Sequence, residues 1–271
     1  MRKCITILAV AALAFLGAGC KKLQSRDHLN KGVQAFKSAQ YPQAVEHFKT
    51  AVELDPTFST ARLYLATAYM QQWIPGVDSP ENKQMAAAAY KEFQEVLRTT
   101  PGDTTALASI ASLYLNQKDW SNARVWYEKL IAVDPKNADA YYSLGFIAWS
   151  DWYPEYQKVR GSVGMKQEDT GIIKDKKARE DLKARYAAIL DKGLASLDKA
   201  IEINGDYSDA MAYENLLVRE RADLCDNKAD YEAEINKADA WVNKALEASK
   251  RKADKKSQGA GGIHTDTPDS K

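Results

Sequence analysis

The sequence has few of the residue types that build metal centres and nucleophilic sites. Its 271 residues include only three cysteines and three histidines. His28, His47 and His264 are far apart in sequence, and none has metal-ligand spacing to a cysteine or carboxylate cluster. The motifs of serine hydrolases, zinc peptidases and nucleotide-binding loops are also missing. We therefore expect no catalytic residue, no metal site and no cofactor, and we interpret the protein as a non-enzyme.

The sequence also lacks an excess of charge of one sign. Its 38 basic and 37 acidic residues give a formal net charge of +1. Removal of Arg2 and Lys3 with an N-terminal signal would leave 36 basic against 37 acidic residues, or −1. A nearly neutral chain has no surplus of cations to neutralise phosphates, so we expect no nucleic-acid partner.

The long uncharged run of the sequence lies at its N-terminus, from Cys4 to Cys20. It follows the basic start Arg2-Lys3 and ends in small residues, which is the order of regions in a secretory signal peptide. The alternative is an uncleaved transmembrane helix. A comfortable span needs about 20 apolar residues, and this run is shorter and contains Gly17 and Gly19, which are poor helix formers. Residues 1–19 are therefore predicted to be a signal peptide.

The end of this run, Leu16-Gly17-Ala18-Gly19-Cys20, resembles the lipobox of bacterial lipoproteins. In that family the cysteine sulfur receives a diacylglyceryl group, so the resemblance implies a lipid at Cys20 and a short lipid-anchored linker over 20–25. The family prefers leucine where this chain has Gly17, although Leu16 stands one position earlier. In Gram-negative lipoproteins an aspartate after the cysteine retains the protein in the inner membrane. Lys21 stands there instead, which favours the periplasmic face of the outer membrane.

A pattern of paired helices follows the predicted anchor. The stretch from Gly32 to Pro56 predicts two amphipathic helices with a polar turn between them, and the proline ends the second one. Similar helix ends recur at Pro101, Pro135 and Gly205. Pro101 and Pro135 are 34 residues apart, which is the period of tetratricopeptide repeats, and the other gaps are this period with insertions.

Small and large residues alternate in the columns of this repeat. The first helix of each pair carries a small residue: Gly32, Ala66, Ala111 and Gly145. The second helix carries a small partner: Ala44, Ala89, Ala123, Gly193 and Ala238. One turn further on comes a large residue: Phe48, Phe93, Tyr127, Leu197 and Val242. This alternation lets helix pairs approach closely and stack.

In these columns the chain resembles the tetratricopeptide repeat (TPR) family over residues 26–250. The resemblance implies an all-α solenoid, a right-handed superhelix of about five helix pairs. The fifth pair departs from the pattern, because Glu214 and Asn215 stand where an apolar and a small residue are expected. Polar residues at these positions are typical of a terminal capping repeat.

Two insertions interrupt the repeat, at about 72–82 and 151–177. In the first, Ser79 is predicted to cap a helix that begins with Pro80. The second is predicted to be a surface excursion. The residues KDKKAREDLKARYAAIL at its end are predicted to lengthen the next helix, the second of the interrupted pair, by several turns. The aromatic residues Trp73, Trp152 and Tyr153 are expected to fix these insertions against the solenoid. Residues 251–271 contain too few apolar side chains to fold, and we expect disorder there.

In the TPR family the first helix of each pair lines a concave groove, and the resemblance places a set of residues there. They are Leu63, Thr67, Met70, Ala108, Ser112, Leu115, Tyr142, Phe146 and Trp149. The last three share one helical face, and clustered aromatics are typical of protein-recognition hot spots. TPR domains that clamp a C-terminal carboxylate use basic residues and asparagine at inward positions. This chain has Leu29, Val33, Tyr64, Thr105 and Ser109 there, so that ligand is disfavoured.

The sequence therefore predicts a non-catalytic scaffold or assembly factor that binds a peptide or helix. Two alternatives stay open. One is a carrier or regulator that binds a small apolar ligand or lipid over Tyr142, Phe146 and Trp149, and a pocket closed by the second insertion would favour it. The other is an accessory subunit of a transpeptidase or peptidase.

Overall fold

The computed structural model describes residues 2–260, with side chains from Gly19 to Lys255. Every regular element in this range is an α-helix, which confirms the predicted all-α class. The helices are α1 (Arg2–Lys37), α2 (Tyr41–Leu54), α3 (Ser59–Gln72), α4 (Pro80–Thr99), α5 (Thr104–Asn116), α6 (Trp120–Val133), α7 (Ala138–Ser162), α8 (Lys176–Ile203), α9 (Ser208–Ala222) and α10 (Lys228–Ala260). Residues 261–271 and the predictions made for them, His264 included, lie outside the described part.

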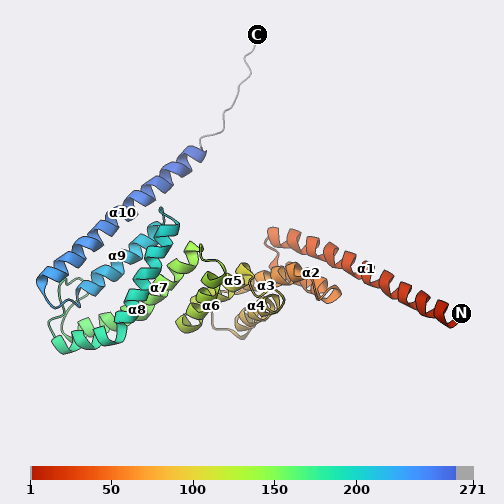
Figure 1. Cartoon of the computed structure of the whole chain (residues 1–271), viewed down its shortest axis with the longest axis horizontal. Helices are drawn as coiled ribbons and strands as arrows, with labels where there is room; N and C mark the ends of the chain where they lie inside the picture. The colour runs from red at the N-terminus through yellow and green to blue at the C-terminus, as the bar shows by residue number, and fades with distance from the viewer. Residues whose placement is uncertain (1, 261–271) are drawn as a thin grey trace, which may run out of the picture. The chain divides into compact units, whose positions relative to one another are not determined.

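The chain divides into two compact units, residues 1–133 and 134–271. Within unit 1 each helix packs against the next one along the chain, from α1 to α6, and unit 2 repeats this pattern from α7 to α10 (Figure 1). These neighbours form five consecutive helix pairs, α1–α2 to α9–α10, as the sequence period predicts.

The small and large columns of the repeat meet in the structure. A Cβ atom added to Gly32 would lie 2.5 Å from the ring of Phe48, and one added to Gly145 would overlap the side chain of Leu197. Phe48 and Leu197 are completely buried. At both positions glycine leaves room for a large side chain of the neighbouring helix to pack directly against the backbone.

Replacing Gly145 with valine is expected to lower the free energy of unfolding by about 1–3 kcal/mol, because the added atoms must displace Leu197 from a filled core. Gly161, in the same helix α7, is a matched control, since an added Cβ atom there meets nothing within 4 Å. Gly161→Ala is expected to leave the protein unchanged or stabilise it by up to about 1 kcal/mol. Urea unfolding followed by circular dichroism measures both changes, and equal effects would refute this account of the packing.

The first insertion is an ordered loop between α3 and α4. The Ser79 hydroxyl accepts a hydrogen bond from the Asn82 backbone N–H at 3.1 Å, and Pro80 opens α4, as predicted. The buried Asn82 side chain accepts a bond from Ile74 N at 2.7 Å and donates to the carbonyls of Ile74 and Val77, both at 2.8 Å. The loop backbone is therefore fixed to the first turn of α4.

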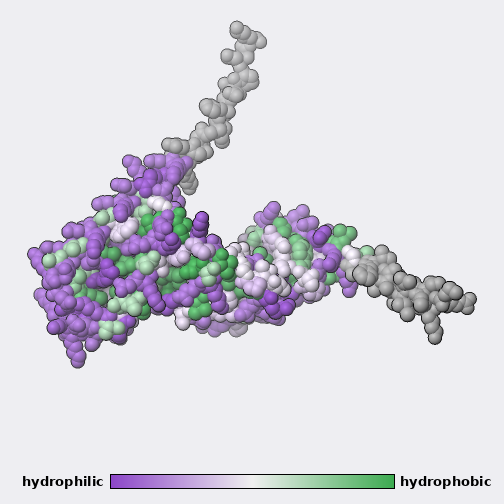
Figure 2. Space-filling view, viewed as in Figure 1, coloured by the Kyte–Doolittle hydropathy of each residue, from purple (hydrophilic) through white to green (hydrophobic). Residues whose placement is uncertain are grey.

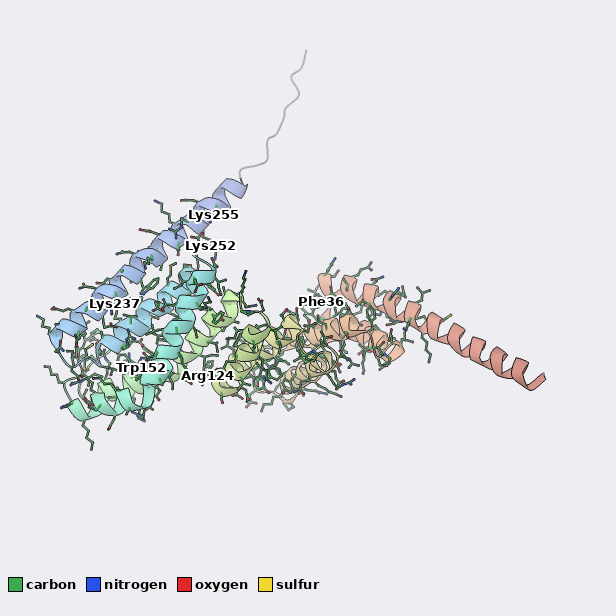
Figure 3. The ribbon with its side chains drawn as sticks, viewed as in Figure 1. Phe36, Arg124, Trp152, Lys237, Lys252 and Lys255 are labelled. Carbon is green, nitrogen blue, oxygen red and sulfur yellow. The ribbon has the colours of Figure 1, made fainter. Side chains whose placement is uncertain are left out.

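The second insertion starts later than predicted. Residues 151–162 continue α7 as helix, and the connecting loop covers only 163–175. Trp152 is completely buried within unit 2 and is not a loop residue (Figure 3). The expected lengthening of the second helix is present, since α8 begins at Lys176. The helix continues because aromatic residues at helical spacing find partners on α8 and α9.

Both ends of the predicted solenoid also differ from expectation. Residues 20–25 are part of α1 and not an extended linker, and Ser25 Oγ donates to the Ala51 carbonyl at 2.7 Å. At the other end α10 continues through residues 251–260, which were expected to be disordered. Arg251 and Lys255, one helical turn apart, form ion pairs with Asp206 at 2.8 and 2.7 Å and hold this part of α10.

Where its side chains are described, the visible face of the last part of α10 is hydrophilic (Figure 2). Among the described residues, no helix is both long enough and apolar enough to span a membrane.

Candidate functional site

Three of the predicted groove residues come together in unit 2. Tyr142, Phe146 and Trp149 lie along α7, and all three contact the ring of Tyr213 from α9. The centroids lie 5.8, 5.4 and 5.4 Å from that of Tyr213, and the interplanar angles of 66°, 89° and 70° are those of edge-to-face contacts. We call these four residues the α7–α9 aromatic surface.

The α7–α9 aromatic surface is partly exposed. Each of its four side chains is half-buried. Tyr142, Trp149 and Tyr213 also pack against the core of unit 2. The surface is extended by Tyr207, whose ring lies 5.1 Å from Tyr142, and by Tyr153, which stacks on Trp149 at 4.8 Å. These rings form a continuous row along α7 and α9, which are the first helices of two successive pairs.

The surface offers hydroxyl groups as well as ring faces. Burial, and then the neighbouring Tyr213 and Asp209, raise the pKa of Tyr142 to about 12, and burial raises the pKa of Tyr213. Both phenols therefore stay protonated at neutral pH. Within the described part of the chain neither hydroxyl makes a hydrogen bond, so both remain available to a partner.

A buried carboxylate fixes the tryptophan rings from below. Glu220 of α9 accepts a hydrogen bond from Trp149 Nε1 at 3.1 Å and one from Trp152 Nε1 at 2.8 Å. Burial raises the pKa of Glu220 to about 7, and the two indole donors offset part of that shift. Glu220 thus joins α9 to α7 and sets the orientation of Trp149 in the surface.

A second buried network fastens the loop over 163–175. Arg160 of α7 forms an ion pair with Asp223 at the end of α9, and Tyr156 donates to the same carboxylate at 2.8 Å. Arg160 also donates to the loop carbonyls of Lys166 and Asp169, and Ile173 N donates to the Asp223 carbonyl at 2.9 Å. Burial raises the pKa of Asp223 to about 6, offset in part by Tyr156 and Arg160. The loop is therefore held at the α9–α10 turn.

The other predicted groove residues lie in unit 1. Leu63 and Met70 of α3 pack against the core of that unit, and the Thr67 hydroxyl donates to the Leu63 carbonyl at 2.8 Å. On α5, Ala108, Ser112 and Leu115 are half-buried. These side chains are smaller or engaged within their own helix and form no cluster of rings.

Glu214 does not face solvent as a capping residue would. It is only 4% exposed, and its Oε2 atom is buried without a hydrogen-bond partner. Burial, followed by the nearby Asp198, raises its pKa from 4.5 to about 8. A carboxyl whose folded pKa lies above its unfolded one lowers stability progressively as the pH rises between the two values.

Replacing Glu214 with leucine is therefore expected to stabilise the protein, by about 1–3 kcal/mol at pH 9. The gain must shrink as the pH falls from about 8 toward 4.5, because the native carboxyl becomes protonated in this window. Urea unfolding at several pH values measures the difference. A gain that does not depend on pH would show that the charge of Glu214 is not its cause, and exposed Glu202→Leu is the control.

The cysteines and histidines with described side chains are Cys20, Cys225, His28 and His47. Cys20 is exposed and Cys225 is partly buried, with a pKa raised chiefly by burial. The structure brings His28 and His47 together, with their Nδ1 atoms 3.3 Å apart. Among the described residues no group of three or more histidine, cysteine or acidic side chains could hold a metal ion.

Sequence reasoning missed several residues of the site. Tyr213 occupies the repeat column of Tyr64, so its place on an inner helix could have been found by extending that column to α9. Glu220, Asp223 and Arg160 gave no such signal. The side-chain bonds that join α7 to Glu220 and Asp223 span between 63 and 71 residues of sequence and match no motif.

The stacked helix pairs define a helical repeat protein. Residues 29–104 match the family model described as tetratricopeptide repeat, and residues 111–150 match a second model described as TPR repeat. The chain contains tetratricopeptide repeats, and the resemblance seen in the sequence is confirmed.

Curated relatives share only part of their length with this chain. The mitochondrial import receptor subunit TOM70 of Rattus norvegicus is 25% identical over 174 residues, or 64% of this chain and 22% of the receptor. The human receptor subunit is 28% identical over 108 residues, or 40% of this chain and 17% of the receptor. The chain thus spans about a fifth of these relatives.

Solved structures share the fold. MamA from Desulfovibrio magneticus RS-1, from residue 41 to its end, has a TM-score of 0.56 at 15% identity over 84% of this chain and 96% of MamA. YrrB, described as a TPR protein with an unusual peptide-binding site, has a TM-score of 0.51 at 13% identity over 82% of this chain and 90% of YrrB. Likeness at these identities concerns the fold alone.

Proposed function

We propose that this protein is a non-catalytic scaffold or assembly factor that binds a peptide or helix of a partner protein on the α7–α9 aromatic surface. The observation that carries the proposal is the row of half-buried rings, Tyr142, Phe146, Trp149 and Tyr213, on the first helices of two successive pairs. Aromatic rings on a rigid helical support give large contact areas at small entropic cost.

The geometry favours a peptide over a small apolar ligand or lipid. Tyr213 packs edge-on against the three α7 rings, and the loop over 163–175 is tied to Arg160 and Asp223. The free hydroxyls of Tyr142 and Tyr213 suit the carbonyl and amide groups of a peptide better than a hydrocarbon chain. The fold of YrrB, a peptide-binding TPR protein by its description, agrees with this choice.

Phe146→Ala is expected to weaken capture of the partner at least about tenfold while the fold is kept, because this ring is only half-buried and contacts Trp149 and Tyr213 within the same surface. The measurement is a crosslinked pull-down from envelope membranes with wild type and variant, after circular dichroism has confirmed folding. Leu246→Ala, which removes a side chain 64% exposed on α10, is the control. Equal capture by wild type and Phe146→Ala would contradict the proposal.

We further propose that Cys20 carries a covalent lipid and anchors the protein at the periplasmic face of the outer membrane. The lipobox-like sequence before Cys20 and the lysine after it support this location. Several acyl chains would be needed for stable anchoring. Cys20→Ser is expected to move the protein from the membrane fraction to the soluble fraction of the envelope. Continued membrane association of this variant would count against the anchor.

A further inference from the structure

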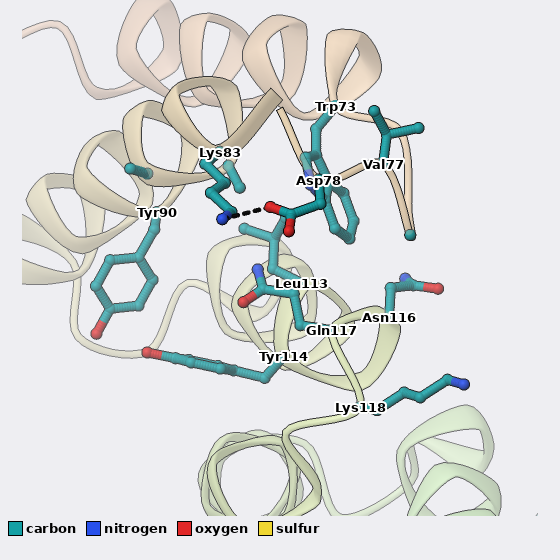
Figure 4. Close-up of a pocket in the computed structure, with 13 residues that line it drawn as sticks. Trp73, Val77, Asp78, Lys83, Tyr90, Leu113, Tyr114, Asn116, Gln117 and Lys118 are labelled. Carbon is teal, nitrogen blue, oxygen red and sulfur yellow. Dashed lines mark ion pairs between the residues drawn. The ribbon is translucent and has the colours of Figure 1, made fainter. Parts of the chain in front are cut away.

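Unit 1 contains a pocket that the groove prediction did not include. It has a volume of about 710 Å³, within the range of small-molecule sites, and lies between the α3–α4 loop, α4 and α5 (Figure 4). Its walls are largely apolar and aromatic, with Trp73 and Val77 from the loop, Ala87 and Tyr90 from α4, and Leu113 and Tyr114 from α5.

The insertion in the repeat creates one wall of this pocket. Residues 73–79 form the loop, and the buried Asn82 side chain holds it through bonds to Ile74 N, Ile74 O and Val77 O. Trp73 follows α3 and packs against the core of unit 1, so its position is also fixed. The wall is therefore formed before any ligand arrives, which lowers the entropic cost of binding.

Several polar groups around the pocket are paired within the protein. Tyr90 OH accepts a hydrogen bond from Gln94 Nε2 at 2.6 Å, and Tyr114 is hydrogen-bonded to Tyr90. At the rim, Asp78 of the loop and Lys83 of α4 form an ion pair with each other (Figure 4). Lys118 is exposed at the edge. No buried charge of the pocket is therefore left to neutralise a charged ligand.

Three donors at the pocket make no hydrogen bond within the described part of the chain. They are the Trp73 indole N–H and, at the exposed edge, the Gln117 side-chain amide and the Lys118 ammonium. A charged ligand would lose its hydration in this pocket without gaining a buried partner, whereas an uncharged ring would gain aromatic contacts on several sides.

We propose that this pocket binds a small, uncharged molecule with an aromatic ring system. The site is separate from the α7–α9 aromatic surface and does not rest on the function proposed for it.

A matched pair of fluorescent probes tests this site. N-phenyl-1-naphthylamine is uncharged at neutral pH, and its 8-sulfonate has the same rings with one negative charge. Both are titrated against the full chain, against Ala87→Phe, which fills the pocket from an exposed position of α4, and against Ala195→Phe, the same change on an exposed position of α8. Circular dichroism confirms that both variants fold. Dye bound to any other apolar segment is retained in Ala87→Phe and can be subtracted.

We expect the uncharged probe to bind with one site per chain and about tenfold more tightly than the sulfonate. Ala87→Phe should weaken its binding about tenfold or more, and Ala195→Phe should leave it unchanged. Tighter binding of the sulfonate would overturn the assignment in favour of an anionic ligand. Unchanged binding by Ala87→Phe, or no saturable binding at about 100 μM probe, would remove the site altogether.

Discussion

Replacing Asp223 with alanine is expected to lower the free energy of unfolding by about 3–5 kcal/mol. The Arg160 and Asp223 side chains are each only 5% exposed, so the variant would leave a buried guanidinium without its counter-charge. Tyr156 would lose the acceptor of its hydroxyl at the same time. Removal of one partner from a buried pair is costly because the other keeps its desolvation penalty.

Urea unfolding followed by circular dichroism measures this change, and Asp239→Ala is the matched control. Asp239 joins α10 to Arg219 of α9 in an ion pair, but its side chain is 59% exposed. Its loss is expected to change stability by no more than about 1 kcal/mol. Similar losses in the two variants would mean that burial does not distinguish these pairs, and the role assigned to Asp223 would be wrong.

Trp152→Ala is expected to be similarly severe, at about 3–5 kcal/mol. The side chain is completely buried, stacks on Tyr156 with ring centroids 5.0 Å apart, and contacts Tyr186 of α8 at 5.4 Å. Its loss would leave a large cavity between α7 and α8. It would also free one oxygen of Glu220, the residue that orients Trp149 in the α7–α9 aromatic surface.

The control for Trp152 is Trp241→Ala on α10. Trp241 is half-buried, and Lys244 Nζ lies 3.9 Å from its ring centroid. We expect less than half the destabilisation of Trp152→Ala, since less apolar surface returns to water. If unfolding experiments show equal losses, Trp152 does not occupy the core of unit 2.

The repeat architecture could be predicted because it depends on local patterns. The proline-terminated helices and the small columns, such as Gly32 with Phe48 and Gly145 with Leu197, appear directly in the sequence and meet in the structure. The cap at Ser79 was likewise predictable, because its hydrogen bond spans only three residues.

The continuation of α7 was predictable in principle but was missed. Pro154 and the nearby glycines favour a loop, whereas Trp149, Trp152, Tyr156 and Arg160 recur at intervals of three and four residues, which is the helical period. The tertiary contacts of Trp152 and Tyr156 outweigh the local preference, so the proline is tolerated inside the helix.

The contacts that build the α7–α9 aromatic surface could not be predicted in the same way. The face on α7 is visible in the sequence as Tyr142, Phe146 and Trp149. The addition of Tyr213, and the bonds from Trp149 and Trp152 to Glu220, depend on how α9 packs against α7. The buried position of Glu214 depends in the same way on tertiary packing, because its polar side chain by itself indicates exposure.

Site-specific photocrosslinking tests whether the α7–α9 aromatic surface contacts a partner protein. A benzoyl-phenylalanine residue is placed at position 146, within the α7–α9 aromatic surface, and at exposed position 195 on α8, outside it. Both forms are irradiated in intact cells. We expect a discrete crosslinked protein species from position 146 and none from position 195. A crosslink of equal yield from both positions, or from position 195 alone, would contradict this expectation.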